Sequence, residues 1–129
     1  MKVKIGSDGG NHCVATVTGL LSADLPKPEP VLFFADLNGT PRRLRIDSVQ
    51  FSIQEKMGFY LWWLMGEIKP AGIPQPLDLI MPLESRGGFD LEKIQAISSP
   101  ENSLGIALTS FKVTEKNMGF FIILDLTKQ

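Results

Sequence analysis

The stretch Phe51-Ser52-Ile53-Gln54-Glu55-Lys56-Met57-Gly58-Phe59-Tyr60-Leu61 decides the fold of this chain. On its first arm apolar residues alternate with polar ones, which is the pattern of a half-buried β-strand. A glycine turn then leads into a second, apolar arm that continues to Met65. We therefore predict a hairpin of strands 44–55 and 59–65, in which Gly58 takes the left-handed conformation of a bulged turn.

The same pattern returns near the end of the chain. Phe111-Lys112-Val113-Thr114-Glu115-Lys116-Asn117-Met118-Gly119-Phe120-Phe121-Ile122 repeats the strand, the turn and the return strand, with Asn117 as one extra turn residue. The repeat predicts a second hairpin, over 104–114 and 119–126, whether it arose by duplication or by convergence on the same turn chemistry. Each first strand also shifts its apolar phase midway, which predicts a bulge or a strand that changes sheets.

Strand signals fill most of the remaining sequence. Further strands are predicted over 12–21, 31–37 and 77–83. Residues 89–98 fit a short helix and a strand equally, and this choice stays open. The pattern predicts an all-β chain with one domain over 1–129: an antiparallel β-sandwich or a jelly-roll or barrel-like fold, with two similar hairpins and at most one short helix. Residues 1–30, which end in a proline-rich stretch, could form an extended arm.

Composition narrows the function. The chain has 129 residues, a net charge of −1 and one cysteine, Cys13. The weak negative charge argues against nucleic-acid binding, and a single thiol allows neither an intrachain disulfide nor a cysteine zinc site. The longest apolar runs, Phe59–Met65 and Phe120–Leu124, are too short to cross a membrane as helices, and the first residues lack a signal peptide's apolar stretch. We expect a soluble protein without a membrane or nucleic-acid partner, made in a reducing cytoplasm.

No catalytic, cofactor or metal site is predicted. The segment Gly6-Ser7-Asp8-Gly9-Gly10-Asn11-His12 could contact a cation or a phosphate, but its spacing matches no phosphate or calcium loop, and a turn before a strand explains it. His12 is the single histidine, and no nucleophile motif accompanies it. We expect a protein that is not an enzyme.

The two return strands carry apolar residues on both faces, so both faces need cover. A single sandwich covers one face of each sheet. Burying one tryptophan contributes about 4–6 kcal/mol at about 25 cal/mol per Å², as an upper bound. Trp62 and Trp63 fit one ring in the core with the other under a loop, an interface with another subunit, or a platform for sugar stacking. The predicted interface residues on these strands are Tyr60, Trp62, Trp63, Phe121 and Ile123.

Two further segments are candidates for contact with a partner. Arg42, Arg43 and Arg45 form a basic cluster that fits an edge strand protected by charge or a docking site for an acidic protein surface. Pro26, Pro28 and Pro30 make a stiff, extended segment that could clamp a neighbouring protein.

From residue 45 onward, about two thirds of the chain, the sequence contains an ordered series of segments. They are Ser52-Ile53-Gln54-Glu55 with its glycine turn, Phe59-Tyr60-Leu61-Trp62-Trp63, Leu79-Ile80-Met81-Pro82-Leu83-Glu84-Ser85-Arg86-Gly87-Gly88-Phe89-Asp90 and Phe121-Ile122-Ile123-Leu124-Asp125-Leu126-Thr127-Lys128. As an ordered series these segments resemble those of small structural proteins of tailed bacteriophages, whereas the first third of the chain has no counterpart.

This resemblance implies a virion protein on the capsid exterior, a decoration or cement protein without a cofactor. Its partners would be copies of itself, with a trimer favoured over a dimer, and the major capsid protein. Many weak contacts repeated over a lattice would sum through multivalency. The alternatives are a carbohydrate-binding β-sandwich that uses Trp62 and Trp63, and a head–tail or tail component.

Overall fold

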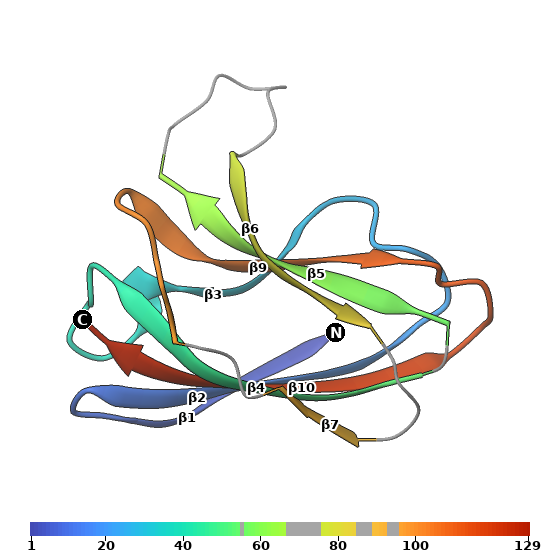
Figure 1. Ribbon diagram of the computed structural model, residues 1–129, viewed down its shortest axis with the longest axis horizontal. Coiled ribbons are helices and arrows are strands. Elements are labelled where there is room, and N and C mark those ends of the chain that lie inside the picture. Colours follow the sequence, from blue (N-terminus) through green and yellow to red (C-terminus); the bar gives the residue numbers. More distant parts are fainter. Residues whose placement is uncertain (55, 67–75, 85–88, 93–95) are drawn as a thin grey trace.

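A computed structural model places the chain in two packed β-sheets (Figure 1). It describes residues 1–54, 56–66, 76–84, 89–92 and 96–129, with the backbone alone at 89–92. Sheet A contains β1 (Lys2–Gly9), β2 (His12–Leu21), β4 (Leu44–Ile53), β7 (Phe89–Glu92), β8 (Ile97–Ser98) and β10 (Met118–Lys128). Sheet B contains β3 (Glu29–Phe33), β5 (Gly58–Met65), β6 (Leu77–Glu84) and β9 (Ser103–Phe111). The described helical structure is one 3-10 turn, η1 (Phe34–Asp36).

The predicted all-β sandwich is confirmed, and its strand order is that of a jelly roll. Sheet A runs β1-β2-β10-β4-β7, with β8 also paired to β4, and sheet B runs β3-β9-β5-β6. Strand pairs are antiparallel throughout the described sheets. From β2 onward the chain crosses repeatedly between the sheets, and strands distant in sequence become neighbours. This interleaving produces the double sheet of a jelly roll, here with six described strands in sheet A, including β1 at one edge, and four in sheet B.

The two predicted hairpins are wrong. β4 pairs with β10 and not with β5, and β9 pairs with β5 and not with β10. Each glycine turn therefore carries the chain from one sheet to the other (right-hand end of Figure 1). A hairpin pairs its two strands within one sheet, whereas a crossing turns their apolar sides toward each other across the core. Both arrangements give the same apolar sequence pattern, which is why the sequence did not separate them.

The turn after β4 also differs from its prediction. Lys56, with φ 74°, takes the left-handed conformation instead of Gly58. Gly58 is required for space, because a Cβ there would lie 2.3 Å from Cζ of Phe111 and 2.9 Å from the carbonyl oxygen of Leu83. Gly58 thus lets β5 pass beneath the Phe111 ring.

The predicted mid-strand bulge exists in one copy of the pattern. The β4–β10 register shifts between Asp125 and Leu126, where Asp47 is the extra residue. In β9 the ladder to β5 stays regular from Leu108 to Phe111, so the phase shift there places Phe111 on the outer face of sheet B. The register of β9 shifts instead near its start, where Leu104 is the extra residue, so the position predicted for the bulge in that strand is wrong.

The N-terminal region is not an arm, in contrast to the expectation for residues 1–30. β1 and β2 form a hairpin, and β2 pairs with β10 along ten residues. Within 89–98 the described segments are the strands β7 and β8, and residues 93–95 lie outside the described residues. The strand predicted over 31–37 is β3, which ends at Phe33, and η1 begins at Phe34.

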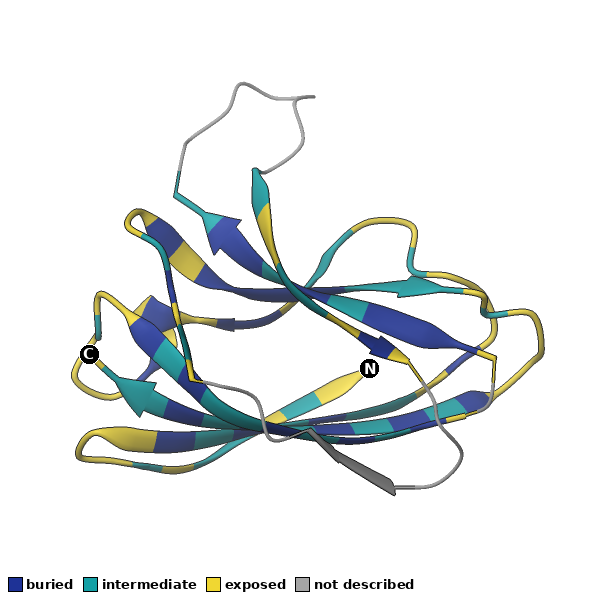
Figure 2. Cartoon of the chain, in the orientation of Figure 1, coloured by how far each residue is buried: buried dark blue, intermediate teal, exposed yellow. Residues whose placement is uncertain are grey.

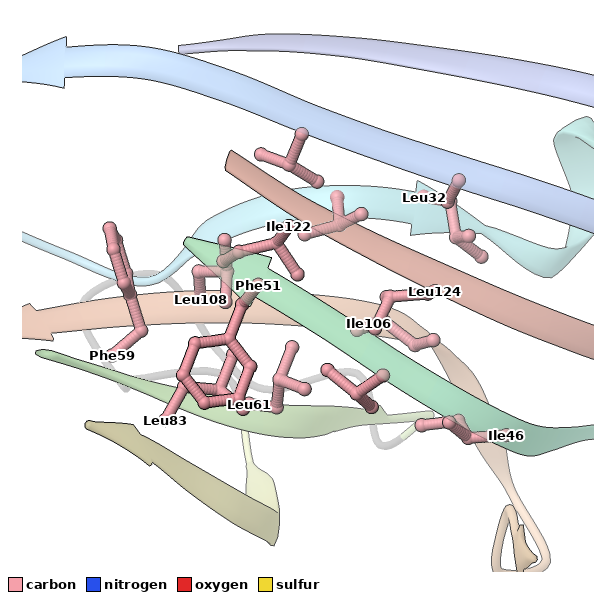
Figure 3. Packing of buried hydrophobic residues seen from close by; sticks show 14 of the residues in the cluster. Leu32, Ile46, Phe51, Phe59, Leu61, Leu83, Ile106, Leu108, Ile122 and Leu124 are labelled. Carbon is pink, nitrogen blue, oxygen red and sulfur yellow. The ribbon is translucent and has the colours of Figure 1, made fainter. Parts of the chain in front are cut away.

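The core lies between the two sheets. Buried residues alternate with more exposed ones along the strands (Figure 2). Phe51, Ile122 and Leu124 of sheet A face Leu61 and Leu108 of sheet B (Figure 3), and each is at most 1% exposed. Cys13 is buried in this core, and burial raises the pKa of its thiol, as expected of a structural cysteine.

Candidate binding surface

An apolar surface lies on the side of sheet B that faces away from the core. We define the outer face of sheet B by Tyr60, Trp62, Leu79, Pro82 and Phe111. Residues directly opposite in antiparallel strands share a face, and Pro82 is opposite Tyr60, while Leu79 is opposite Trp62. Leu79 is 48% exposed, Pro82 is exposed and the three aromatic residues are partly buried.

The three rings of this face contact one another. The Tyr60 ring centroid lies 4.8 Å from that of Phe111 and 5.9 Å from that of Trp62, with tilts of 37° and 57° between the ring planes. The Trp62 indole Nε1–H donates to Thr109 Oγ1 at 2.9 Å. This bond satisfies the indole donor within the sheet, so the surface offers apolar area and no free indole N–H.

The two tryptophans therefore have different environments. Trp63 is 2% exposed, and its ring makes an edge contact with Phe34, with centroids 6.3 Å apart. Trp62 lies on the outer face and is partly exposed. The Trp63 ring thus lies in the core, as one of the three interpretations predicted for one of the two rings. The Trp62 ring lies on the outer face of sheet B. The tilted rings of Tyr60 and Trp62 do not make the flat platform on which a sugar would stack across both.

The corresponding face of sheet A is more polar. Phe121 and Ile123 point away from the core and are partly buried. Phe121 lies between Thr18 and Ser52, and Ile123 lies between Thr16 and Gln50. Hydroxyl and amide groups therefore border both side chains, and the nearby apolar residue on this face is Leu20 of β2, which lies opposite Gly119 and is 63% exposed.

The edges of sheet B are closed to further strands. Its edge strands are β3 and β6, and each carries a proline, Pro30 and Pro82. Proline lacks the N–H that a pairing strand needs. At one edge of sheet A, β1 carries Lys2 and Lys4, which also discourage pairing. The faces are thus better suited to association than these edges.

The arginine cluster is mostly used within the fold. Arg43 donates from Nε and Nη2 to the Ser99 carbonyl oxygen, at 3.1 and 2.7 Å, and Arg45 Nε donates to Asp47 Oδ1 at 2.7 Å. The edge-strand interpretation is wrong, because β4 lies between β10 and β7. Of the three arginines, Arg42 is the one whose side chain has no partner among the described residues. It is exposed and therefore available to a ligand.

The proline-rich segment connects the two sheets between β2 and β3. Pro26 is exposed, Pro28 is partly buried and Pro30 lies within β3. The connection is attached to sheet B by the Leu25 N–H, which donates to Ser110 Oγ at 2.8 Å. Of the clamp predicted from these prolines, Pro26 and Pro30 are exposed, and Pro30 is held in the edge strand β3.

The sequence did not predict a polar clasp at the end of the sandwich. Asp8 Oδ2 accepts from the Asn38 N–H at 2.9 Å, and the Asp8 carbonyl oxygen accepts from Asn38 Nδ2 at 2.6 Å. Lys128 Nζ forms an ion pair with Asp8 Oδ1 and donates to the Asn38 carbonyl oxygen at 2.8 Å. Hydrogen bonds from Lys128 and Asn38 lower the pKa of Asp8. Residues 6–9 of the predicted turn belong to β1, and the turn is confined to Gly10-Asn11. The segment thus has a structural use that its local sequence could not reveal.

A second polar network lies on the outer face of sheet A. His12 Nε2 is 2.5 Å from Asp125 Oδ1, and Thr127 Oγ1 donates to Asp47 Oδ2 at 2.5 Å. Burial by itself would raise the pKa of Asp47, but the hydrogen bonds from Thr127 and Arg45 outweigh it, and the pKa is lowered. His12 contacts a carboxylate rather than a hydroxyl or thiol nucleophile, so this network gives no nucleophile–base pair.

The described part of the chain holds no group of three or more acidic, histidine or cysteine side chains suited to a metal ion. It also has no helix long and apolar enough to span a membrane. Comparisons with protein-family models, curated proteins and solved structures found no match to the chain. The site is therefore interpreted from its own geometry, as a surface suited to apolar contact with another macromolecule.

Proposed function

We propose that this chain is a structural protein of a bacteriophage particle, a decoration or cement protein that binds the capsid exterior through its outer face of sheet B. The observation that carries the proposal is the apolar, partly exposed outer face of sheet B, a sheet whose edge strands β3 and β6 each carry a proline. Tyrosine and tryptophan are frequent anchors of protein interfaces. Jelly-roll folds also occur among viral capsid proteins, which supports the proposal by analogy of fold.

The partners in this proposal are copies of the chain and the major capsid protein. We propose a homo-oligomer, with a trimer favoured over a dimer. Tyr60, Trp62 and Leu79 would be buried at one of these contacts. Hydrophobic contacts of this kind do not depend on charge, so assembly should survive high salt.

Sedimentation velocity on the purified chain at micromolar concentration, in low and in high salt, tests self-association. We expect an oligomer in both buffers. A monomer in both would contradict the proposed oligomer. An oligomer that dissociates in high salt would contradict the apolar mechanism.

Mass spectrometry of purified particles from the phage that encodes the chain tests the proposed location. We expect the chain in mature capsids, at a copy number that scales with that of the major capsid protein. Recovery with isolated tails instead would favour the alternative of a head–tail or tail component.

A further inference from the structure

A groove of about 630 Å³ opens at the end of the sandwich where β3 ends and β9 begins. This is the left-hand end of Figure 1, away from the two turns that join β4 to β5 and β9 to β10. The volume lies within the range of about 300–1,000 Å³ found for small-molecule sites. The groove is separate from the outer face of sheet B, since none of the five residues that define that face lines it.

The groove has an apolar wall with an exposed aromatic ring. Phe33 and Leu104 line it and are 42% and 49% exposed, which is high for such large apolar residues. Beneath them Phe34 is 3% exposed and contacts the buried Trp63 ring edge-on. The wall is therefore supported by the core, and its open ring is available for stacking.

Polar side chains with unused hydrogen-bonding capacity line the same groove. They are Asp36, Thr40, Arg42 and Asn102, and within the described structure none of these side chains has a hydrogen bond or ion pair. Together they supply a carboxylate, a hydroxyl, a guanidinium and an amide, which means both donors and acceptors. One positive and one negative charge leave the lining without net charge.

Two of these residues have unusual backbone conformations. Thr40 has φ 40° and Asn102 has φ 64°, in the region that favours glycine. For a β-branched threonine this conformation is an outlier, and such strain is found preferentially at ligand-binding positions. Local hydrogen bonds hold both turns: the Thr40 N–H donates to the Leu37 carbonyl oxygen at 3.0 Å, and the Ser103 N–H donates to that of Pro100 at 3.3 Å.

We propose that this groove binds a neutral sugar. A pyranose has an apolar C–H face for the Phe33 ring and hydroxyl groups that both donate and accept hydrogen bonds. Asp36 accepts from these hydroxyls, and Arg42 and Asn102 donate to them. A purely apolar ligand would leave all four polar side chains unpaired, and an anion would be opposed by Asp36. The ligand class therefore follows from the balance of charge and of donors and acceptors in the lining.

Isothermal titration calorimetry tests the proposal with glucose, galactose, mannose and N-acetylglucosamine, and with short oligomers of each. We expect at least one of these to bind with a dissociation constant in the millimolar range or tighter. Phe33→Ala and Arg42→Gln should each weaken that binding about tenfold. Both side chains are exposed, and circular dichroism checks that each variant folds.

Leu20→Ala is the matched control, because Leu20 is an exposed apolar residue outside the groove and its truncation should leave sugar binding unchanged. Absence of binding by the wild-type chain across the panel would overturn the proposal. So would loss of binding in Trp62→Ala with retention in Phe33→Ala, which would place the sugar on sheet B. Tighter binding of sialic acid or of an acidic tripeptide than of every neutral sugar would also overturn it. None of these outcomes bears on oligomer formation, which the sedimentation experiment tests separately.

Discussion

The strands β5 and β10 have nearly the same apolar sequence pattern but different surroundings on their outer sides. Tyr60 and Trp62 of β5 are flanked by Phe111, Leu79 and Pro82, whereas Phe121 and Ile123 of β10 lie among threonine, serine and glutamine side chains. An apolar strand therefore does not by itself make an apolar surface. The neighbouring strands decide whether its outward residues merge into one patch or remain separate, and in this fold those neighbours are distant in sequence.

The largest expected effect concerns the inward sides, where the two strands are equivalent. Leu61→Ala in β5 and Ile122→Ala in β10 should each lower the free energy of unfolding by about 2–5 kcal/mol, because both residues are fully buried and each truncation leaves a cavity. Urea denaturation followed by circular dichroism measures both. Ile123→Ala, on the outer side of β10, is the control and should cost about 1 kcal/mol. A cost for Leu61→Ala as small as that of the control would break the equivalence.

The outward sides should differ in their effect on association. Replacing Tyr60 and Trp62 together by serine should weaken self-association about 30-fold or more, since one interface anchor contributes about 2 kcal/mol or more. The matched pair Phe121→Ser and Ile123→Thr should change it less than about threefold. Sedimentation equilibrium gives both constants, with circular dichroism to verify folding. Equal losses in the two double variants would mean that both faces are interfaces.

Acid should act on sheet A, because the carboxylates with lowered pKa values among the described side chains, Asp8 and Asp47, both belong to that sheet. A lowered folded-state pKa stabilises the fold above the ordinary value of 3.8, and this contribution is lost as the pH falls through the folded pKa. We expect the melting temperature to fall below that pH. The double variant Asp8→Asn, Asp47→Asn should melt lower at neutral pH and depend less on pH. An unchanged acid profile in this variant would assign the sensitivity to other groups.

The smallest effect concerns the hydrogen bond beneath the sheet B surface. Thr109→Val keeps the shape of the side chain but removes the acceptor of the Trp62 indole N–H. We expect a loss of about 1 kcal/mol in the free energy of unfolding and a weaker effect on association than that of the Tyr60 and Trp62 double variant. Chemical denaturation measures the loss. A cost above that of Leu61→Ala would show that the bond, rather than the buried leucine, dominates the stability of β5.

Local patterns predicted most strands but not their partners. Local signals located β2 from His12 to Leu21 and the bulge at Asp47, because these depend on neighbouring residues. The sequence pattern did not predict β1, because Lys2 and Lys4 alternate with only two apolar residues, Val3 and Ile5. Pairing of β4 with β10 depends on residues about 70 positions apart, and the same apolar pattern fits a hairpin and a crossing.

The candidate surface was predicted in part for the same reason. Tyr60 and Trp62 were identified from their own strand, but Leu79, Pro82 and Phe111 complete the face only through pairing. The clasp of Asp8, Asn38 and Lys128 joins three segments with no shared local signal. The groove likewise combines the η1 region with the start of β9, so no single stretch of sequence indicates it.

The central position of β10 in sheet A has a kinetic consequence. β10 pairs with β2 on one side and with β4 on the other, yet it follows both in the chain. During synthesis, β2 and β4 emerge from the ribosome without the strand that separates them, so their inner edges stay unsatisfied until residue 128 has left the exit tunnel. Folding of the sandwich should therefore wait for β10 and be slow, as contacts between distant residues generally require. Chaperones or rapid dilution should raise the yield of refolded protein more than added salt does. The reason is that the intermediate in which β10 is not yet paired exposes strand edges through which it can aggregate.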